Sequence, residues 1–253
     1  MGLVATVNIV RPWDDGVPPT RVGTAGIALG DDTARAVERV TYRQEVERVG
    51  DVIVDDGRPV GELAPELAEV WEIVDAVWPD DLRGELAQLS VVREAPRGLV
   101  GVVHPSGTAG WILSLDLADL PDRVLIEETI VHELSHVVTL DREVFTFNQV
   151  DGCAGTAIEL GCAAPDTVLA DFADRFWPDG TAVGADGDFV NVYAMTAAHE
   201  DLAETFTAWT LGWPVEGPVI EAKIELLAAD PQLSSLADAL RTRLLARTDE
   251  PGT

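Results

Sequence analysis

The most restrictive feature of this sequence is HELSH at residues 132–136, in which two histidines are four positions apart and a glutamate follows the first. The motif lies within residues 123–140, an apolar-rich stretch that predicts a long helix. Residues four apart on a helix lie one above the other, with Cβ atoms about 5–6 Å apart. Both imidazoles can therefore reach one metal ion. The chain has only four histidines, so a chance match to this pattern is rare.

Glu133 is expected to lie beside the metal rather than on it, because one residue turns the helix by about 100°. From there its carboxylate can take a proton from a metal-bound water and later hand it to a leaving amine. Two imidazoles at this spacing are typical of Zn²⁺, which binds histidine nitrogen at about 2.0–2.1 Å. The motif therefore predicts one zinc ion per chain, with His132 and His136 as ligands and Glu133 as general base.

A catalytic zinc ion needs one more protein ligand than the motif supplies. The metzincin extension would require glycine at 139 and histidine at 142, but this chain has Thr139 and Arg142 there. The third ligand must therefore come from another segment. The candidate is YAMTAAHEDLAETF at residues 193–206, most of which falls in a predicted helix over residues 196–211.

Two acids of that helix, Glu200 and Glu204, are one helical turn apart. The apolar residues of the same helix would bury it against the core, and carboxylates that point inward beside them need a positive partner. A zinc ion would supply that charge. The residues alone leave His199, Glu200, Asp201 and Glu204 open as the third ligand.

The remaining pattern predicts an α+β fold. Further helices are predicted at residues 62–78, 165–177, 219–229 and 233–247, and strands at residues 89–93, 98–104 and 111–116. This order favours a small mixed sheet packed on the central HExxH helix, followed by a mainly helical C-terminal part. We expect one domain over residues 62–253. Residues 1–61 are expected to form an N-terminal arm or small subdomain of unknown role.

The motif and the downstream acidic helix together resemble the gluzincin zinc metallopeptidases, the branch of thermolysin. The sequence is most similar to the anthrax lethal factor-like group and related bacterial zinc-binding metallopeptidases. In that group a tyrosine lies seven residues before a Glu-x-x-Ala-Glu-x-Phe helix. The matching residues here are Tyr193, Glu200, Ala203, Glu204 and Phe206. The resemblance covers about residues 62–212 and extends to GCA at residues 161–163 and FW at 176–177.

That resemblance implies a zincin-like catalytic domain with Glu200 as the third zinc ligand. It implies that Tyr193 hydrogen-bonds the oxyanion of the tetrahedral intermediate, and that Glu204 orients a ligand imidazole. It also implies that residues 111–116 form the strand along which a peptide substrate lies. The simpler alternatives are a buried structural tyrosine at Tyr193 and a helix-dipole role for Glu204.

These features predict a zinc-dependent endopeptidase that hydrolyses a peptide or protein substrate through a zinc-activated water. Two alternatives stay open: a zinc hydrolase of a non-peptide amide, and a non-catalytic zinc-binding interaction module derived from a peptidase. The presence of Glu133 and Tyr193 argues against the second alternative, because a purely structural zinc site needs neither residue.

The charge of the chain bears on its partners. It has 17 Lys+Arg against 45 Asp+Glu, a formal net charge of -28. Such a surface repels phosphate backbones and anionic lipids, so nucleic acid and membrane are not expected as partners. Repulsion between copies favours a monomer. No apolar run approaches the ~18–20 residues of a membrane span.

Cys153 and Cys162 are nine residues apart in a glycine-rich segment that can close into a loop. A disulfide across it would stabilise the fold by about 2–3 kcal/mol on the chain-entropy model; two unbridged thiols are the alternative. A disulfide favours a secreted or extracytoplasmic location. The first residues lack a secretory signal, so the expectation is a mature chain whose signal has been removed, and a cytoplasmic location stays open.

Overall fold

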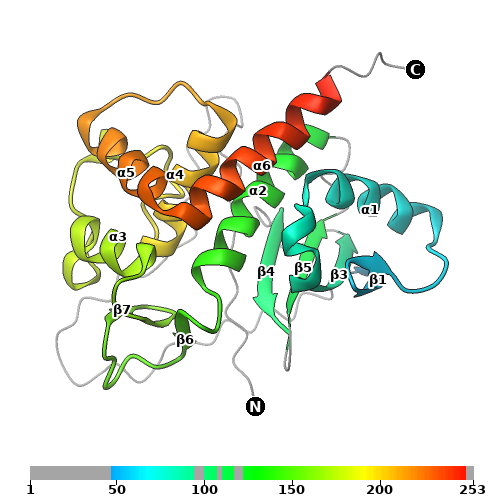
Figure 1. The fold of residues 1–253 in the computed structure, drawn as a ribbon, viewed down its shortest axis with the longest axis horizontal. Helices are drawn as coiled ribbons and strands as arrows, with labels where there is room; N and C mark the ends of the chain where they lie inside the picture. The colour runs from blue at the N-terminus through cyan, green and yellow to red at the C-terminus, as the bar shows by residue number, and fades with distance from the viewer. Residues whose placement is uncertain (1–46, 94–99, 107–109, 117–121, 249–253) are drawn as a thin grey trace.

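The computed structural model describes residues 47–93, 100–106, 110–116 and 122–248 (Figure 1). Its helices are α1 (Pro65–Val77), α2 (Arg123–Thr139), α3 (Val168–Phe176), α4 (Ala198–Leu211), α5 (Pro218–Ala229) and α6 (Pro231–Thr248). Its strands are β1 (Glu47–Asp55), β2 (Arg58–Pro59), β3 (Leu86–Arg93), β4 (Gly101–Pro105), β5 (Trp111–Asp116), β6 (Phe145–Phe147), β7 (Thr156–Ile158) and β8 (Gly161–Ala163). Within these residues, no helix has the length and apolar character needed to cross a membrane.

The main sheet has five strands in the order β2-β1-β3-β5-β4. Only the β3–β5 pair is parallel, so the sheet is mixed. β4 lies at one end of this order and pairs with β5, for example Val103 with Leu113. The domain boundary expected at residue 62 falls inside this sheet. β1, which precedes that residue, pairs with β3, which follows it. The rest of the expected N-terminal arm, residues 1–46, lies outside the described residues.

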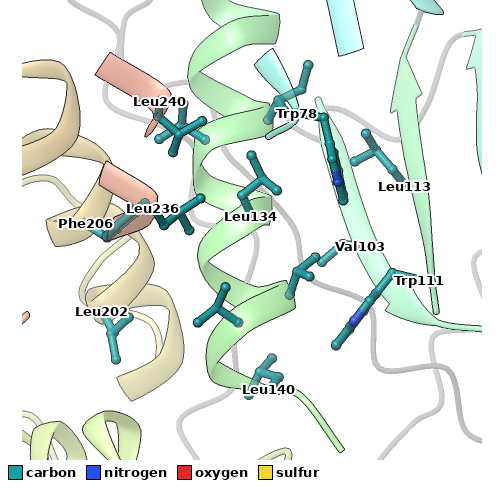
Figure 2. Close-up of a cluster of buried hydrophobic side chains, with 14 of the residues drawn as sticks. Trp78, Val103, Trp111, Leu113, Leu134, Leu140, Leu202, Phe206, Leu236 and Leu240 are labelled. Carbon is teal, nitrogen blue, oxygen red and sulfur yellow. The ribbon is translucent and has the colours of Figure 1, made fainter. Parts of the chain in front are cut away.

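α2 runs through the middle of the molecule, with the main sheet on one side, α4 on the other, and α6 crossing it (Figure 1). The side chains of Trp111 and Leu113 fill the sheet side, and those of Phe206 and Leu236 fill the helical side (Figure 2). Residues 129–139 of α2 are all buried. A helix enclosed all round has no polar face, so its histidines and Glu133 face the interior.

Helix ends follow local capping signals. Asp122 caps α2, and its carboxylate accepts a hydrogen bond of 3.1 Å from the backbone N–H of Leu125. α3 begins at Val168 rather than at the predicted residue 165, because the hydroxyl of Thr167 accepts from the N–H of Ala170 and defines the first turn. The α+β class and most helix positions therefore agree with the prediction.

The observed strand boundaries differ more from the predicted ones than the helix boundaries do. β3 begins at Leu86, three residues before its predicted start, and β4 begins at Gly101. The first residues of that predicted strand, 98 and 99, lie outside the described residues. The segment predicted as a loop around the cysteines contains a second sheet of order β6-β8-β7. Its strands have three residues each, too few for alternation to show in the sequence.

The predicted disulfide between Cys153 and Cys162 is present, with Cα atoms 5.5 Å apart. Cys162 lies in the middle strand of the second sheet. The bond therefore ties the loop before β7 to the strand that pairs with both β6 and β7.

Lys223, the only lysine of the chain, forms a buried ion pair that connects α5 to α4. Its ammonium donates to Asp201 at 2.9 Å and to the backbone carbonyl of Asp188 at 2.8 Å. Asp201 also accepts from the indole N–H of Trp177 at 2.8 Å, and the ammonium lies 4.0 Å from the ring centre of Phe189. Both charged side chains are fully buried, so this network anchors α4 to α5 inside the protein.

Candidate metal centre

The three predicted metal ligands meet at the contact between α2 and α4. Nε2 of His132 lies 3.1 Å from Nε2 of His136 and 3.2 Å from Oε2 of Glu200. The third side of this triangle, from Nε2 of His136 to the same Glu200 oxygen, is 3.4 Å. All three side chains are buried. Of the groups in the described chain, this trio is the one arranged to hold a metal ion.

The donor atoms fit a zinc ion in spacing and in chemistry. Four ligands arranged tetrahedrally at 2.0–2.1 Å from a metal lie about 3.3 Å apart, and the observed separations are 3.1–3.4 Å. Two imidazoles and one carboxylate are a catalytic zinc set, which leaves a fourth position open. Burying these groups together with no cation between them would be costly.

His132 is oriented from its far side by Glu204. Its Nδ1 lies 2.8 Å from Oε1 of Glu204, and the other oxygen of Glu204 accepts from the side-chain amide of Asn191 at 2.5 Å. Burial opposes the charged imidazolium, but the charge of Glu204 and the contact with Glu200 raise the pKa of His132 well above its ordinary value. Glu204 therefore lies where a residue that orients a ligand histidine would be needed.

His136 is held as a neutral imidazole. Burial, with the added effect of neighbouring His132 and His199, lowers the pKa of His136 to about 4 despite the contact with Glu200. No group among the described residues hydrogen-bonds its Nδ1. A neutral ring is the form that a metal ligand requires, so His136 needs no proton release at neutral pH.

Glu133 is beside the trio and is held by the edge of the main sheet. Its Oε2 accepts a 2.8 Å hydrogen bond from the backbone N–H of Val103 in β4. Its Oε1 is buried and has no hydrogen-bond partner within the described residues. Burial, aided by the charges of Glu200 and Glu204, raises the pKa of Glu133 to about 8. One oxygen is therefore fixed, while the other is available for proton transfer.

Tyr193 lies in the loop before α4, with its ring centre 5.9 Å from that of His132. Burial and the charge of Glu200 raise the pKa of its phenol far above the ordinary value, so the hydroxyl keeps its proton. Two hydrogen bonds shape the loop. Asn191 accepts from the N–H of Ala194 at 2.9 Å, and Thr196 donates to the carbonyl of Tyr193 at 2.7 Å.

The alternatives to Glu200 as third ligand lie in other places. Asp201 pairs with Lys223 of α5 instead of with the histidines of the motif. Glu204 contacts Nδ1 of His132, away from the Nε2 atoms. His199 lies against Oε1 of Glu200 at 3.2 Å, whereas Oε2 is the oxygen near both histidines. Glu200 is therefore the residue of this set that completes the triangle.

One expectation was wrong. The strand at residues 111–116 was expected to receive the substrate, but β5 pairs with β3 on one side and β4 on the other. Because β5 has a strand on each side, a peptide cannot pair with it as an added strand. Among the described strands, β4 is at the edge of the sheet, and it is also the strand whose Val103 contacts Glu133.

Three contributors to the site were absent from the sequence argument. The backbone of Val103 carries no side-chain signal. Asn191 precedes Tyr193 by two residues, a spacing that could have suggested a role in shaping the loop. Glu159, which lies 3.3 Å from Nδ1 of His199, is far from both helices in the sequence.

Comparison with known proteins finds little. No model of a known protein family matches the chain, and no curated protein matches it. Among solved structures, one described as a "putative zinc-binding metallo-peptidase", from Bacteroides caccae, superimposes with a TM-score of 0.42 and 16% identity. The match covers 76% of this chain and 82% of that chain. So distant a likeness carries no argument about function, which has to come from the site itself.

Proposed function

We propose that the protein is a zinc-dependent endopeptidase, with His132, His136 and Glu200 as ligands of one zinc ion. The observation that carries the proposal is the triangle of 3.1–3.4 Å formed by two imidazole nitrogens and one carboxylate oxygen. A bound zinc ion polarises the scissile carbonyl and lowers the pKa of a coordinated water to about 7.

Glu133 moves the protons. Its Oε2 is anchored to Val103, so Oε1 takes the proton of the attacking water and later delivers it to the leaving amine. With a metal ion bound, the positive charge would oppose the effect of burial on the pKa of Glu133, so that its carboxylate would be ionised and able to accept the proton. This placement favours catalysis over a structural zinc site, because a structural site needs no carboxylate beside its ligands.

A peptide is the favoured substrate because an edge strand runs beside Glu133. In the part of the chain that the structure describes, β4 pairs with one strand only. An extended peptide can add to such an edge through main-chain hydrogen bonds. A small non-peptide amide would not use this edge. Tyr193 then donates its hydroxyl proton in a hydrogen bond to the oxyanion that develops on the carbonyl.

The test of the activity uses a mixture of unstructured peptides and mass spectrometry of the products. Cleavage at internal bonds is expected, and it should disappear with a zinc chelator and return when zinc is added. If the protein carries one zinc ion per chain and cleaves no peptide internally, the endopeptidase assignment is wrong and the interaction-module alternative takes its place.

Changing Tyr193 to phenylalanine tests the oxyanion role. We expect kcat to fall by about 10²–10³-fold, the usual effect of losing one such donor, while zinc content stays the same. The ring remains to fill its buried position, so the melting temperature should change little. A Tyr193→Phe enzyme with unchanged kcat would show that the residue serves packing alone.

A further inference from the structure

The two oxygens of Glu200 have different partners. Oε2 lies within 3.4 Å of Nε2 of both His132 and His136, whereas Oε1 lies 3.2 Å from Nε2 of His199. His199 is buried, with its ring centre 5.6 Å from that of His136. An oxygen occupied by His199 is turned away from the position where the metal would bind.

His199 is in turn held from its other side by Glu159. Oε1 of Glu159 lies 3.3 Å from Nδ1 of the ring. The two ring nitrogens of His199 therefore face two different carboxylates, that of Glu159 on one side and that of Glu200 on the other.

The position of Glu159 is set by the second sheet. It is in the two-residue turn between β7 and β8, where Ile158 pairs with Gly161. β8 also pairs with β6, and it approaches so closely that a Cβ on Gly161 would lie 2.2 Å from the carbonyl oxygen of Thr146. The disulfide at Cys162 ties the same strand to the preceding loop. The turn thus has little freedom to move Glu159 away from His199.

We propose that Glu159 and His199 are positioning residues that keep Glu200 a one-oxygen metal ligand. This inference rests on the proposed zinc site. A carboxylate that is free to turn can bind a metal through both oxygens, and it would then fill the coordination position that water and substrate need. With Oε1 held by His199, only Oε2 is available to the metal, and the fourth position stays open.

The first test replaces His199 with alanine and measures metal binding rather than catalysis. We expect the zinc dissociation constant to rise by about 10–100-fold, the usual effect of losing a residue that orients a ligand. In the Co²⁺-substituted protein, the visible absorption should weaken, because two-oxygen binding raises the coordination number. His199→Gln can place an amide N–H near the position of Nε2, so it should restore most of the wild-type spectrum.

Glu159→Gln provides an independent test that leaves His199 in place. We expect a smaller rise in the zinc dissociation constant, about 2–10-fold, because Glu159 is half exposed and its charge is screened. The matched control is Glu143→Gln, the same change at an exposed residue just before β6, which should leave zinc affinity and the Co²⁺ spectrum unchanged.

The inference and the zinc site can fail separately. If wild-type protein binds no zinc, the proposed function is wrong. If wild-type protein binds zinc while the His199→Ala variant keeps the same dissociation constant and the same Co²⁺ spectrum, the positioning role is wrong. If the His199→Ala variant does not fold, the Glu159→Gln variant provides the test. A zinc dissociation constant equal to that of the wild type in Glu159→Gln would overturn the proposal.

Discussion

Replacing Glu133 with glutamine is expected to lower kcat by about 10²–10⁴-fold, the range for a lost general acid–base group. The amide has the same shape as the carboxyl group, and its oxygen can still accept from the N–H of Val103. It cannot take a proton, however, so the step assigned to Oε1 stops. Because Glu133 is not one of the three converging ligands, the zinc content should stay at one ion per chain.

This result is checked by measuring kcat on a cleaved peptide together with zinc by elemental analysis. Glu127→Gln is the matched control, since Glu127 is on the same helix and pairs with Arg123 near the helix start. It should retain wild-type kcat and zinc. A Glu133→Gln enzyme with unreduced kcat would refute the assignment of the general base.

The largest expected effect on stability comes from Lys223→Met. The change leaves Asp201 buried without its cation, and losing one partner of a buried ion pair costs about 3–5 kcal/mol. The side chains that surround it, Trp177 and Phe189, provide no replacement charge. The free energy of unfolding, measured with chemical denaturant, should fall by that amount. Glu225→Met, at an exposed residue of the same helix, should change it by less than about 0.5 kcal/mol.

The loss in Lys223→Met is expected to depend on pH through Asp201. Burial already raises the pKa of Asp201 to about 6 with the lysine present, and without the lysine it rises further. A folded-state pKa above the unfolded value of about 3.9 favours folding at low pH, and this benefit is lost as pH rises through the folded pKa. The difference from wild type should therefore be smaller at about pH 5 than at about pH 8.

Adding Asp201→Asn to Lys223→Met separates the lost pair from a general packing defect. The double variant removes the uncompensated charge and keeps an acceptor for the indole of Trp177. It should be more stable than the single variant at neutral pH. Equal destabilisation of both variants would show that the cost comes from packing around Lys223 rather than from the buried charge.

The centre of this site could be predicted from the sequence because its residues are close together in the chain. His132, Glu133 and His136 are part of one helix, so their relative placement follows from helical geometry alone. Glu200 could be favoured over its neighbours because the resemblance matched a second pattern of fixed spacing. Only the structure separates it from His199 and Asp201, because their directions depend on how α4 packs against α2 and α5.

The features that could not be predicted from the sequence depend on contacts between segments that are far apart in the chain. The alternating residues of β5 indicate a strand, but strand order is a property of the whole sheet, so the edge beside Glu133 turned out to be β4. The short strands of the second sheet have no period to detect. As a result, no sequence pattern indicated that Glu159 lies against His199. The pairing of Lys223 with Asp201 was hidden for the same reason.

The measurement that tests the central claim most directly is the zinc content of the purified wild-type protein and of Glu200→Ala, with Glu216→Ala at an exposed loop position as the matched control. The account predicts one zinc ion per chain in the wild type and in the control, and zinc that is lost or bound much more weakly in Glu200→Ala. A wild-type protein that contains no zinc and takes up none when it is added would contradict the account.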